Sequence, residues 1–378
     1  MKLFQSSLML VGCLGVVILA GCSSGSTPSS TMNVRLVDGP INGFQEVNVN
    51  IQTVEISSGG GWISLGAPKK TINLLSLVGG VEETLASGAS LPAGHYQQMR
   101  LMLGSGNTVK LADGTTQPLT VPSGLQTGIK LIVSFDVKAG TTEDVFIDFD
   151  AAHSIQVVGA GASGSYILRP TVSAFDKVVT GSVSGTFTDT ARNPLVGAMV
   201  YAETLDGSGK AGIVRSAVTN ASGQYTLNLL PIGGTFYIVS QPVVGAISYD
   251  AKASAAQNVT SSSAVLTYNA SFTADALVGA VSGSITPLPT ANQADTVNLA
   301  QSLSTGSGSF SFIVRSSLAT MVSTTSETYS FTGVPVASYT VLGVRTTTAS
   351  DGSTTTSSSA STPITITASG TVVANIAM

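Results

Sequence analysis

Apolar and polar residues alternate along much of this chain. Val34 and Leu36 are separated by a single polar residue, and Val47, Val49 and Ile51 continue the pattern in the next run. A period of two places apolar side chains on one face of a β-strand and polar side chains on the other. By the same criterion we expect strands at residues 62–65, 97–103, 129–137 and 145–149.

Turn residues separate these runs. Asp113-Gly114 lies between the strand-like runs 109–111 and 119–121, which predicts a β-hairpin. The glycines at 159, 161 and 164 match the spacing of a dinucleotide-binding loop, but they lie between two strand-like runs, 155–158 and 166–168. A phosphate-binding loop needs a following helix whose amino terminus faces the phosphate. We therefore expect a hairpin loop here.

Two segments depart from the strand pattern. One helix is expected between residues 72 and 85, where clustered leucines could form one apolar face. Gly79-Gly80 would make this helix short or broken. Residues 350–362 are rich in Ser and Thr and include Asp351-Gly352, which predicts a long exposed loop between strands at 339–344 and 364–366.

The second half of the chain contains an internal repeat. The sequence GSVSG at 181–185 is echoed by GAVSG at 279–283, and a Tyr follows 44 residues after Gly181 and 50 residues after Gly279. This repeat favours a duplicated β-sandwich. We expect an all-β protein with a β-rich domain at 32–176, then immunoglobulin-like or transthyretin-like sandwiches at 178–272 and 277–378.

Several ordered motifs carry a resemblance to known families. The first unit contains VRLVDGP at 34–40, GWISL at 61–65, LPAGHYQQMRL at 91–101, DFDAAHSI at 148–155 and LRP at 168–170. In order and spacing these motifs resemble the domain of unknown function 4382 family of bacterial lipoproteins, over about residues 32–176. The resemblance implies a β-rich exported domain of unassigned role.

The second unit resembles another family. The sequences NPLVGAMV at 193–200 and TNASGQYTL at 219–227, followed by an apolar run at 236–239, are similar to the carboxypeptidase-regulatory-like, transthyretin-like β-sandwich. The glycines and Asn take turn conformations, while alternating apolar residues fill one sheet face. Residues 277–378 read as a diverged second copy.

The amino terminus has the pattern of an export signal. Lys2 precedes an apolar stretch at 8–20, which is shorter than the roughly 20 residues that a membrane-spanning helix needs. The stretch ends in Leu19-Ala20-Gly21-Cys22, which resembles the lipobox of bacterial lipoproteins. That resemblance implies cleavage of residues 1–21, a diacylglycerol on the Cys22 sulfur and an acylated, palmitate-type amino terminus.

The expected anchor sets the compartment. Three acyl chains hold a protein firmly at a membrane, and the Ser-rich segment 22–31 would act as a flexible tether. We expect a cell-envelope protein, in the outer membrane if the host is Gram-negative, because Ser23 rather than Asp follows the Cys. The sequence does not determine whether the domains lie on the periplasmic or the cell-surface face of that membrane.

Composition excludes several kinds of chemistry. Removal of residues 1–21 takes away Lys2, so 15 of the 16 basic and all 20 acidic side chains remain, a net charge of −5 that does not suit nucleic acid. Cys22, with its lipid, is then the one remaining Cys, which excludes disulfides, thiolate nucleophiles and Cys-based metal sites. His95 and His153 are too few for a multi-histidine zinc site, and no cofactor is expected.

Asp148 and Asp150 are the weak candidates for chemistry. Two residues apart on a strand, both carboxylates would face one side and, with Asp38 or Glu143, could bind calcium or act as an acid/base pair beside His153. The alternative, which we favour, is that these carboxylates accept backbone hydrogen bonds and close a turn.

The expected function is therefore non-enzymatic. We expect a membrane-anchored binding or adhesion module whose ligand is unassigned, with a glycan or an envelope or extracellular protein as candidate partner. Five tyrosines could stack on sugar rings, although their alternation favours the sheet core: Tyr201, Tyr225, Tyr237, Tyr249 and Tyr268. Alternative functions are a carbohydrate-binding surface protein, a structural spacer and, least favoured, a metal- or carboxylate-dependent hydrolase.

Overall fold

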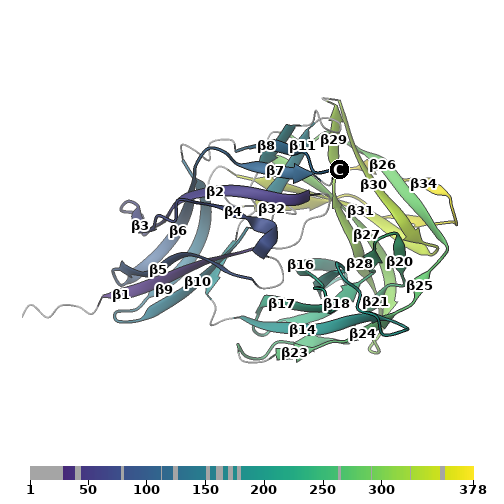
Figure 1. Ribbon diagram of the computed structural model, residues 1–378, viewed down its shortest axis with the longest axis horizontal. Coiled ribbons are helices and arrows are strands. Elements are labelled where there is room, and N and C mark those ends of the chain that lie inside the picture. The colour runs from purple at the N-terminus through teal and green to yellow at the C-terminus, as the bar shows by residue number, and fades with distance from the viewer. Residues whose placement is uncertain are drawn as a thin grey trace, which may run out of the picture.

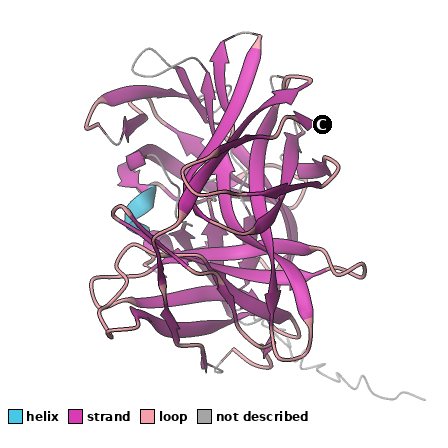
Figure 2. Ribbon diagram, turned by 90° about the vertical axis from the view of Figure 1, so that its right-hand side faces the viewer, coloured by secondary structure: helices cyan, strands magenta, loops and turns pink. Residues whose placement is uncertain are grey.

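The chain folds almost entirely into β-strands, as Figures 1 and 2 show. The computed structural model describes residues 29–38, 44–77, 81–111, 113–121, 127–149, 154–158, 165–168, 173–176, 180–262, 265–290, 292–323, 325–349 and 354–378. This confirms the expected all-β class. In these ranges, no helix has the length and apolar character required to cross a membrane.

The first unit consists of two sheets packed face to face around one core. Its elements are β1 (Ser30–Val37), β2 (Phe44–Ser57), β3 (Ile63–Gly66), β4 (Lys70–Asn73), the 3-10 helix η1 (Leu74–Leu77), β5 (Glu83–Leu91), β6 (Gly94–Leu103), β7 (Thr108–Leu111), β8 (Thr116–Thr120), β9 (Ile129–Val137), β10 (Thr142–Asp148), β11 (Ile155–Val158), β12 (Ser165–Leu168) and β13 (Ser173–Asp176). The smaller sheet has the order β13-β10-β1-β5, with β1 and β10 parallel.

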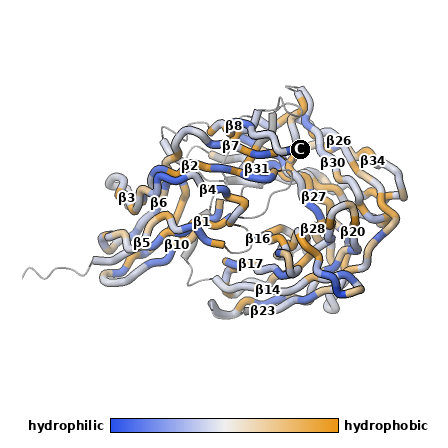
Figure 3. The backbone as a smooth tube through the Cα atoms, in the orientation of Figure 1, coloured by the Kyte–Doolittle hydropathy of each residue, from blue (hydrophilic) through white to orange (hydrophobic). Residues whose placement is uncertain are grey.

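The alternation of apolar residues explains this core. Val34, Leu36, Val47, Val49 and Ile51 are fully buried between the sheets, and the tube in Figure 3 changes repeatedly between apolar and polar colours along the strands. The strand expected at 129–137 coincides with β9. The hairpin expected at Asp113-Gly114 is confirmed, since β7 and β8 pair antiparallel on either side of it.

The expected helix is shorter than its apolar pattern suggested. Only η1 forms, and strand β5 occupies the second half of the segment from Glu83 onward. The Asn73 side-chain oxygen accepts hydrogen bonds from the backbone N–H groups of Leu75 and Val47, at 3.2 and 3.0 Å. These hydrogen bonds hold the turn against β2. The rest of the segment forms β5, which pairs with β1, and so cannot be helical.

The second and third units are two β-sandwiches in tandem. The second contains β14 (Thr180–Asp189), β15 (Met199–Leu205), β16 (Ala211–Val218), β17 (Gln224–Pro231), β18 (Thr235–Ser240), β19 (Val243–Val244), β20 (Ile247–Tyr249), β21 (Lys252–Ala253), β22 (Gln257–Asn258), β23 (Val265–Thr267), β24 (Ala270–Phe272) and β25 (Ala274–Asp275). The third contains β26 (Val278–Thr286), β27 (Gln293–Ser304), β28 (Ser309–Leu318), β29 (Thr320–Ser323), β30 (Ser326–Pro335), β31 (Ser338–Thr348), β32 (Thr354–Ser358), β33 (Thr362–Thr365), β34 (Thr371–Val373) and β35 (Ile376–Ala377).

The two sandwiches repeat one strand plan. β14 pairs antiparallel with β17 and parallel with β23 and β24, just as β26 pairs with β30, β34 and β35. Gly185 lies opposite Tyr225, and Gly283 lies opposite Tyr329. A Cβ at Gly185 would lie 1.8 Å from the Tyr268 carbonyl oxygen, so the close approach of the parallel strand requires glycine.

The prediction of a long loop at 350–362 was partly wrong. Residues 354–358 form strand β32, which pairs antiparallel with β31, and β31 itself extends to Thr348. Thr is a good strand former, and Ser/Thr content alone did not distinguish this polar strand from a loop. Residues 350–353 lie outside the described residues.

The third unit folds back onto the first. β12 pairs in parallel with β8 of the first unit, and its hairpin partner β11 pairs in parallel with β29 of the third. A single fourteen-stranded sheet therefore runs through both units, and Figure 1 shows β8, β11 and β29 side by side along the top of the molecule. The three units form a closed arrangement rather than a line.

Candidate functional site

The sequence-predicted sites are only partly within the described residues. The motif Leu19-Ala20-Gly21-Cys22 and most of the 22–31 tether lie outside them. Asp150 and His153 also lie outside, and so does the glycine-rich loop at 159–164. Lipidation at Cys22 therefore stays a prediction.

Asp148 forms an ion pair between two units. Its Oδ2 atom lies 3.0 Å from Nη1 of Arg215 on β16, and the two side chains are 13% and 22% exposed, respectively. Glu143 lies five residues away at the other end of β10, about 16 Å along the strand, so it does not join Asp148. In the described part of the chain, no group of three or more His, Cys, Asp or Glu side chains could hold a metal ion.

The tyrosines proposed for sugar stacking belong to the core. Tyr201, Tyr225, Tyr237 and Tyr249 are buried, and Tyr268 is half-buried. Tyr225 donates a hydrogen bond to the Tyr268 carbonyl at 2.8 Å, and the Tyr237 ring packs 5.2 Å from that of Phe312. Their alternation along the strands thus indicated packing correctly.

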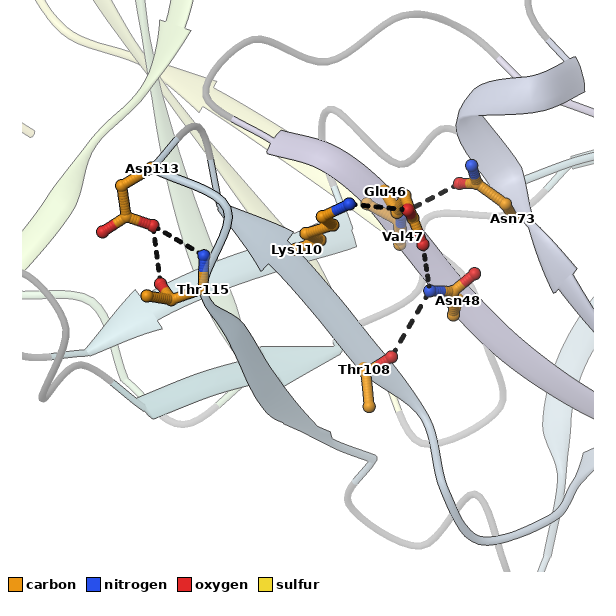
Figure 4. A network of polar contacts seen from close by, with 8 residues as sticks. All are labelled: Glu46, Val47, Asn48, Asn73, Thr108, Lys110, Asp113 and Thr115. Carbon is orange, nitrogen blue, oxygen red and sulfur yellow. Dashed lines mark hydrogen bonds and ion pairs between the residues drawn. The ribbon is translucent and has the colours of Figure 1, made fainter.

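A polar network covers one end of the first unit's large sheet (Figure 4). Glu46 accepts hydrogen bonds from Asn48 and Lys110, at 3.0 and 3.3 Å, and both lower the pKa of its carboxyl. In the β7–β8 turn, Asp113 accepts from the backbone and hydroxyl of Thr115, which lowers its pKa too. These bonds satisfy the carboxylates within the sheet and its turn, which indicates a structural role.

The second and third units meet at a buried junction. Strand β18 is buried on both faces, because Phe236 and Ile238 enter the core of the second unit while Tyr237 and Val239 enter that of the third. On the neighbouring strand β15, Glu203 is fully buried, and its Oε2 accepts the backbone N–H of Ile313 on β28 at 3.0 Å. Burial raises the pKa of Glu203 well above its usual range.

Arg315 completes this junction. Its Nε donates to Gln241 of the second unit at 2.8 Å, and its two terminal nitrogens donate to the carbonyls of Thr332 and Gly333, also at 2.8 Å. Gln241 in turn donates to the Tyr339 hydroxyl at 3.0 Å. Arg315, Gln241 and Tyr339 are therefore linked across the seam by hydrogen bonds, which fixes the relative orientation of the two sandwiches.

A groove opens beside this junction. It has a volume of about 460 Å³ and lies between the end of the β15–β16 hairpin and the outer face of the β27-β31-β32 sheet. Asp206 and Lys210 stand on the hairpin side, and Ile313 lies at its base. Cavities of this size at domain seams are typical of small-molecule sites, so the groove is the candidate functional site.

The groove floor has a regular arrangement. Val344 on β31 is flanked by Thr296 on β27 and Ser358 on β32, which are its Cα partners. Leu342 similarly lies opposite Asn298. Neighbouring strands are about 4.8 Å apart. Leu342 and Val344 therefore lie beside an amide and a hydroxyl on β27, and Val344 also lies beside a hydroxyl on β32.

Pattern analysis missed the groove and the junction. Tyr201, Glu203 and Leu205 share one phase of β15, so an acidic residue at an apolar phase was the available signal for Glu203. Thr296 and Asn298 lie in the opposite phase to the core residues Val297 and Leu299. In sequence such positions are indistinguishable from an ordinary solvent-facing strand surface.

Comparison with known proteins bears on the first unit. The domain of unknown function DUF4382 matches residues 29–170, which confirms the resemblance expected from the motifs. A comparison with curated proteins returns no match.

Solved structures with some similarity include three bacterial proteins. The Bacillus anthracis TIE protein is 12% identical, with 92% of this chain and 50% of that chain covered and a TM-score of 0.21. A streptococcal ancillary pilin is 9% identical, with 92% and 98% covered and a TM-score of 0.22. The shaft pilin spaA of Lactobacillus rhamnosus GG is 12% identical, with 53% and 97% covered and a TM-score of 0.20. The chain spans half the length of the first, and TM-scores this low carry no argument about function.

Proposed function

We propose that this protein is a non-enzymatic binding or adhesion module of the bacterial cell envelope, tethered by a lipid on Cys22. The observation that carries the proposal is the groove held at the seam of the second and third units. Buried contacts at Glu203 and Arg315 set the two walls relative to each other. A site preorganised in this way loses less entropy when a ligand binds.

The arrangement of the units argues against a simple spacer. A spacer gains reach when its domains follow one another in a line, whereas here β11 and β29 bring the third unit back to the first. The Asp148–Arg215 ion pair also joins the first unit to the second. The units therefore support a compact body more than an extended stalk.

The hydrolase alternative receives little support from Asp148. A carboxylate held 3.0 Å from a guanidinium is stabilised as an anion and is a weak base for taking a proton.

The lipobox resemblance and Ser23 support an outer-membrane location in a Gram-negative host. The turn motifs at 193–200 and 219–227 support kinship of both sandwiches with the carboxypeptidase-regulatory-like domain.

Fractionation and binding assays test this proposal. In a bacterial host grown with an alkyne-tagged palmitate, the wild-type chain is expected in the membrane fraction with label, and a Cys22→Ser chain is expected in the soluble fraction without label. The purified Cys22→Ser chain is expected to bind isolated cell envelopes or a glycan array saturably, without turnover. Membrane retention of the Cys22→Ser chain, or hydrolysis without saturable binding, would contradict the proposal.

A further inference from the structure

Two threonines that line the groove have hydroxyl groups with no hydrogen-bond partner among the described residues. Thr296 and Thr346 are 5% and 8% exposed, and both side chains line the groove. Among the described residues neither hydroxyl makes a hydrogen bond, and neither oxygen is sealed away from solvent, so both open onto the groove. These two hydroxyls are therefore free to hydrogen-bond water or a ligand in the groove.

The shape and chemistry of the floor restrict the ligand. Leu342 and Val344 offer an apolar surface only one strand wide, at about 4.8 Å from the polar groups of the neighbouring strands. Asn298 and Thr296 flank it on the β27 side, and Ser358 flanks Val344 on the β32 side. Thr346 ends the apolar row on β31. A matching ligand has an apolar face with hydrogen-bonding groups along both edges. A pyranose ring with equatorial hydroxyls has this form, because its C–H bonds point to the faces and its hydroxyls to the rim.

The charge of the groove favours a neutral ligand. Asp206 and Lys210 stand together on the hairpin side and offset each other. Asp206 Oδ1 already accepts hydrogen bonds from the Ser208 backbone and hydroxyl and from the Lys210 backbone, at 2.9, 2.7 and 2.9 Å. A phosphate or an acidic polymer would need an excess of positive charge here.

An extended peptide fits the groove less well. Peptides that dock on sheets gain affinity from main-chain hydrogen bonds to an open strand edge. The floor, by contrast, is a sheet face in which β27 pairs with β28 and β31, and β31 pairs with β27, β32 and β33. The polar groups that it offers are side-chain hydroxyls and an amide.

We infer that this groove binds a neutral linear oligosaccharide of sugars with equatorial hydroxyls, aligned along β31. This inference rests on the proposed function and gives the ligand class of the same site. The hydroxyls of Thr296 and Thr346 and the amide of Asn298 would bond the sugar hydroxyls. Ser316 already fixes that amide by donating to Asn298 Oδ1 at 2.7 Å.

Titration with cellohexaose tests the inference. The probe is added to the mature Cys22→Ser chain in a calorimeter, beside a neutral peptide and polygalacturonate. Saturable binding of cellohexaose alone is expected. Thr296→Val and Thr346→Val each remove one hydroxyl and keep the side-chain shape, so each should weaken binding about fivefold.

The matched control is Ser357→Ala on β32. Its neighbours Thr356 and Ser358 line the groove, whereas Ser357 belongs to the opposite phase of the strand, so its affinity should equal that of the parent. Circular dichroism shows that each variant is folded. Absence of saturation with cellohexaose, preference for either comparison ligand, or an affinity equal to that of the parent in both Thr variants would overturn the inference. If envelope binding by the parent persists in that case, only the ligand class fails; if it is also lost, the proposed function fails with it.

Discussion

Glu327 illustrates how burial changes the chemistry of a single residue. It lies in the third unit beside Asp295, whose carboxylate accepts hydrogen bonds from Arg345 at 2.7 and 2.5 Å. Burial, followed by the hydrogen bond and negative charge of Asp295, raises the pKa of Glu327 to about 9. The folded protein therefore holds this carboxyl in its neutral form at pH 7.

The residue makes stability depend on pH. In the unfolded chain Glu327 ionises near pH 4.5, whereas in the folded chain it keeps its proton until about pH 9. Its contribution is fully present below pH 4.5 and is lost as pH rises towards 9, by at most about 1.4 kcal/mol per pH unit. Urea unfolding of Glu327→Gln between pH 5 and 9 should show a flatter dependence than the parent. Equal slopes for the parent and Glu327→Gln would contradict this prediction.

At the scale of elements, the edge of β28 is protected by another sheet. β28 has β27 as its only named strand partner in the described ranges, so its other edge faces the second unit, where Glu203 accepts the Ile313 N–H. An open strand edge invites pairing with other chains. The carboxyl of Glu203 thus closes an edge that would otherwise be available for aggregation.

Replacement of Glu203 separates hydrogen bonding from charge. Burial raises the pKa of Glu203, and Glu203→Gln retains an oxygen acceptor in a side chain of the same shape, so this variant should be tolerated. Glu203→Leu leaves the Ile313 N–H buried and unpaired, which should cost about 1–3 kcal/mol. Hydrogen exchange measured by NMR should be faster at Ile313 in the Leu variant than in the Gln variant. Equal exchange in the two variants would show that Glu203 does not protect this strand.

At the scale of the whole molecule, a strand pairing and an ion pair are two of the contacts that tie the first unit to the others. One is the β11–β29 pairing, and the other is the Asp148–Arg215 ion pair. The ion pair is largely shielded from water, so salt screens it less than a surface pair. Leu318 of β28 also packs against the core of the first unit, so the three units form one closed body.

A double-mutant cycle measures the second contact. Asp148→Asn, Arg215→Gln and the double variant should give a coupling free energy of about 0.5–2 kcal/mol in thermal unfolding. The exposed Lys70–Glu83 pair, with side chains 53% and 28% exposed, is the matched comparison and should couple by under about 1 kcal/mol and weaken further with salt. No coupling between Asp148 and Arg215 would mean that the units are held together by other contacts.

Much of the fold was predictable, and the candidate site was not. Period-two alternation located β1, β2 and β9 and the β7–β8 hairpin, because burial of one sheet face is a local pattern. The leucine cluster predicted too long a helix near η1, and the Ser/Thr content predicted a loop where β32 forms. Pairing with β1 and with β31 decided the structure of these two segments. Asp148 was a visible candidate, but its partner Arg215 is distant in sequence.

The sequence by itself determined the β class, the repeated sandwich plan and an expected lipid anchor at Cys22. These features depend on alternation, on glycine at close approaches and on a short linear motif, all of which are local. Tertiary structure alone decided that burial raises the pKa of Glu203, that Asp148 joins two units and that Thr296 and Thr346 line a groove. The reason is physical: the pKa and the partners of a side chain depend on what other strands bring against it.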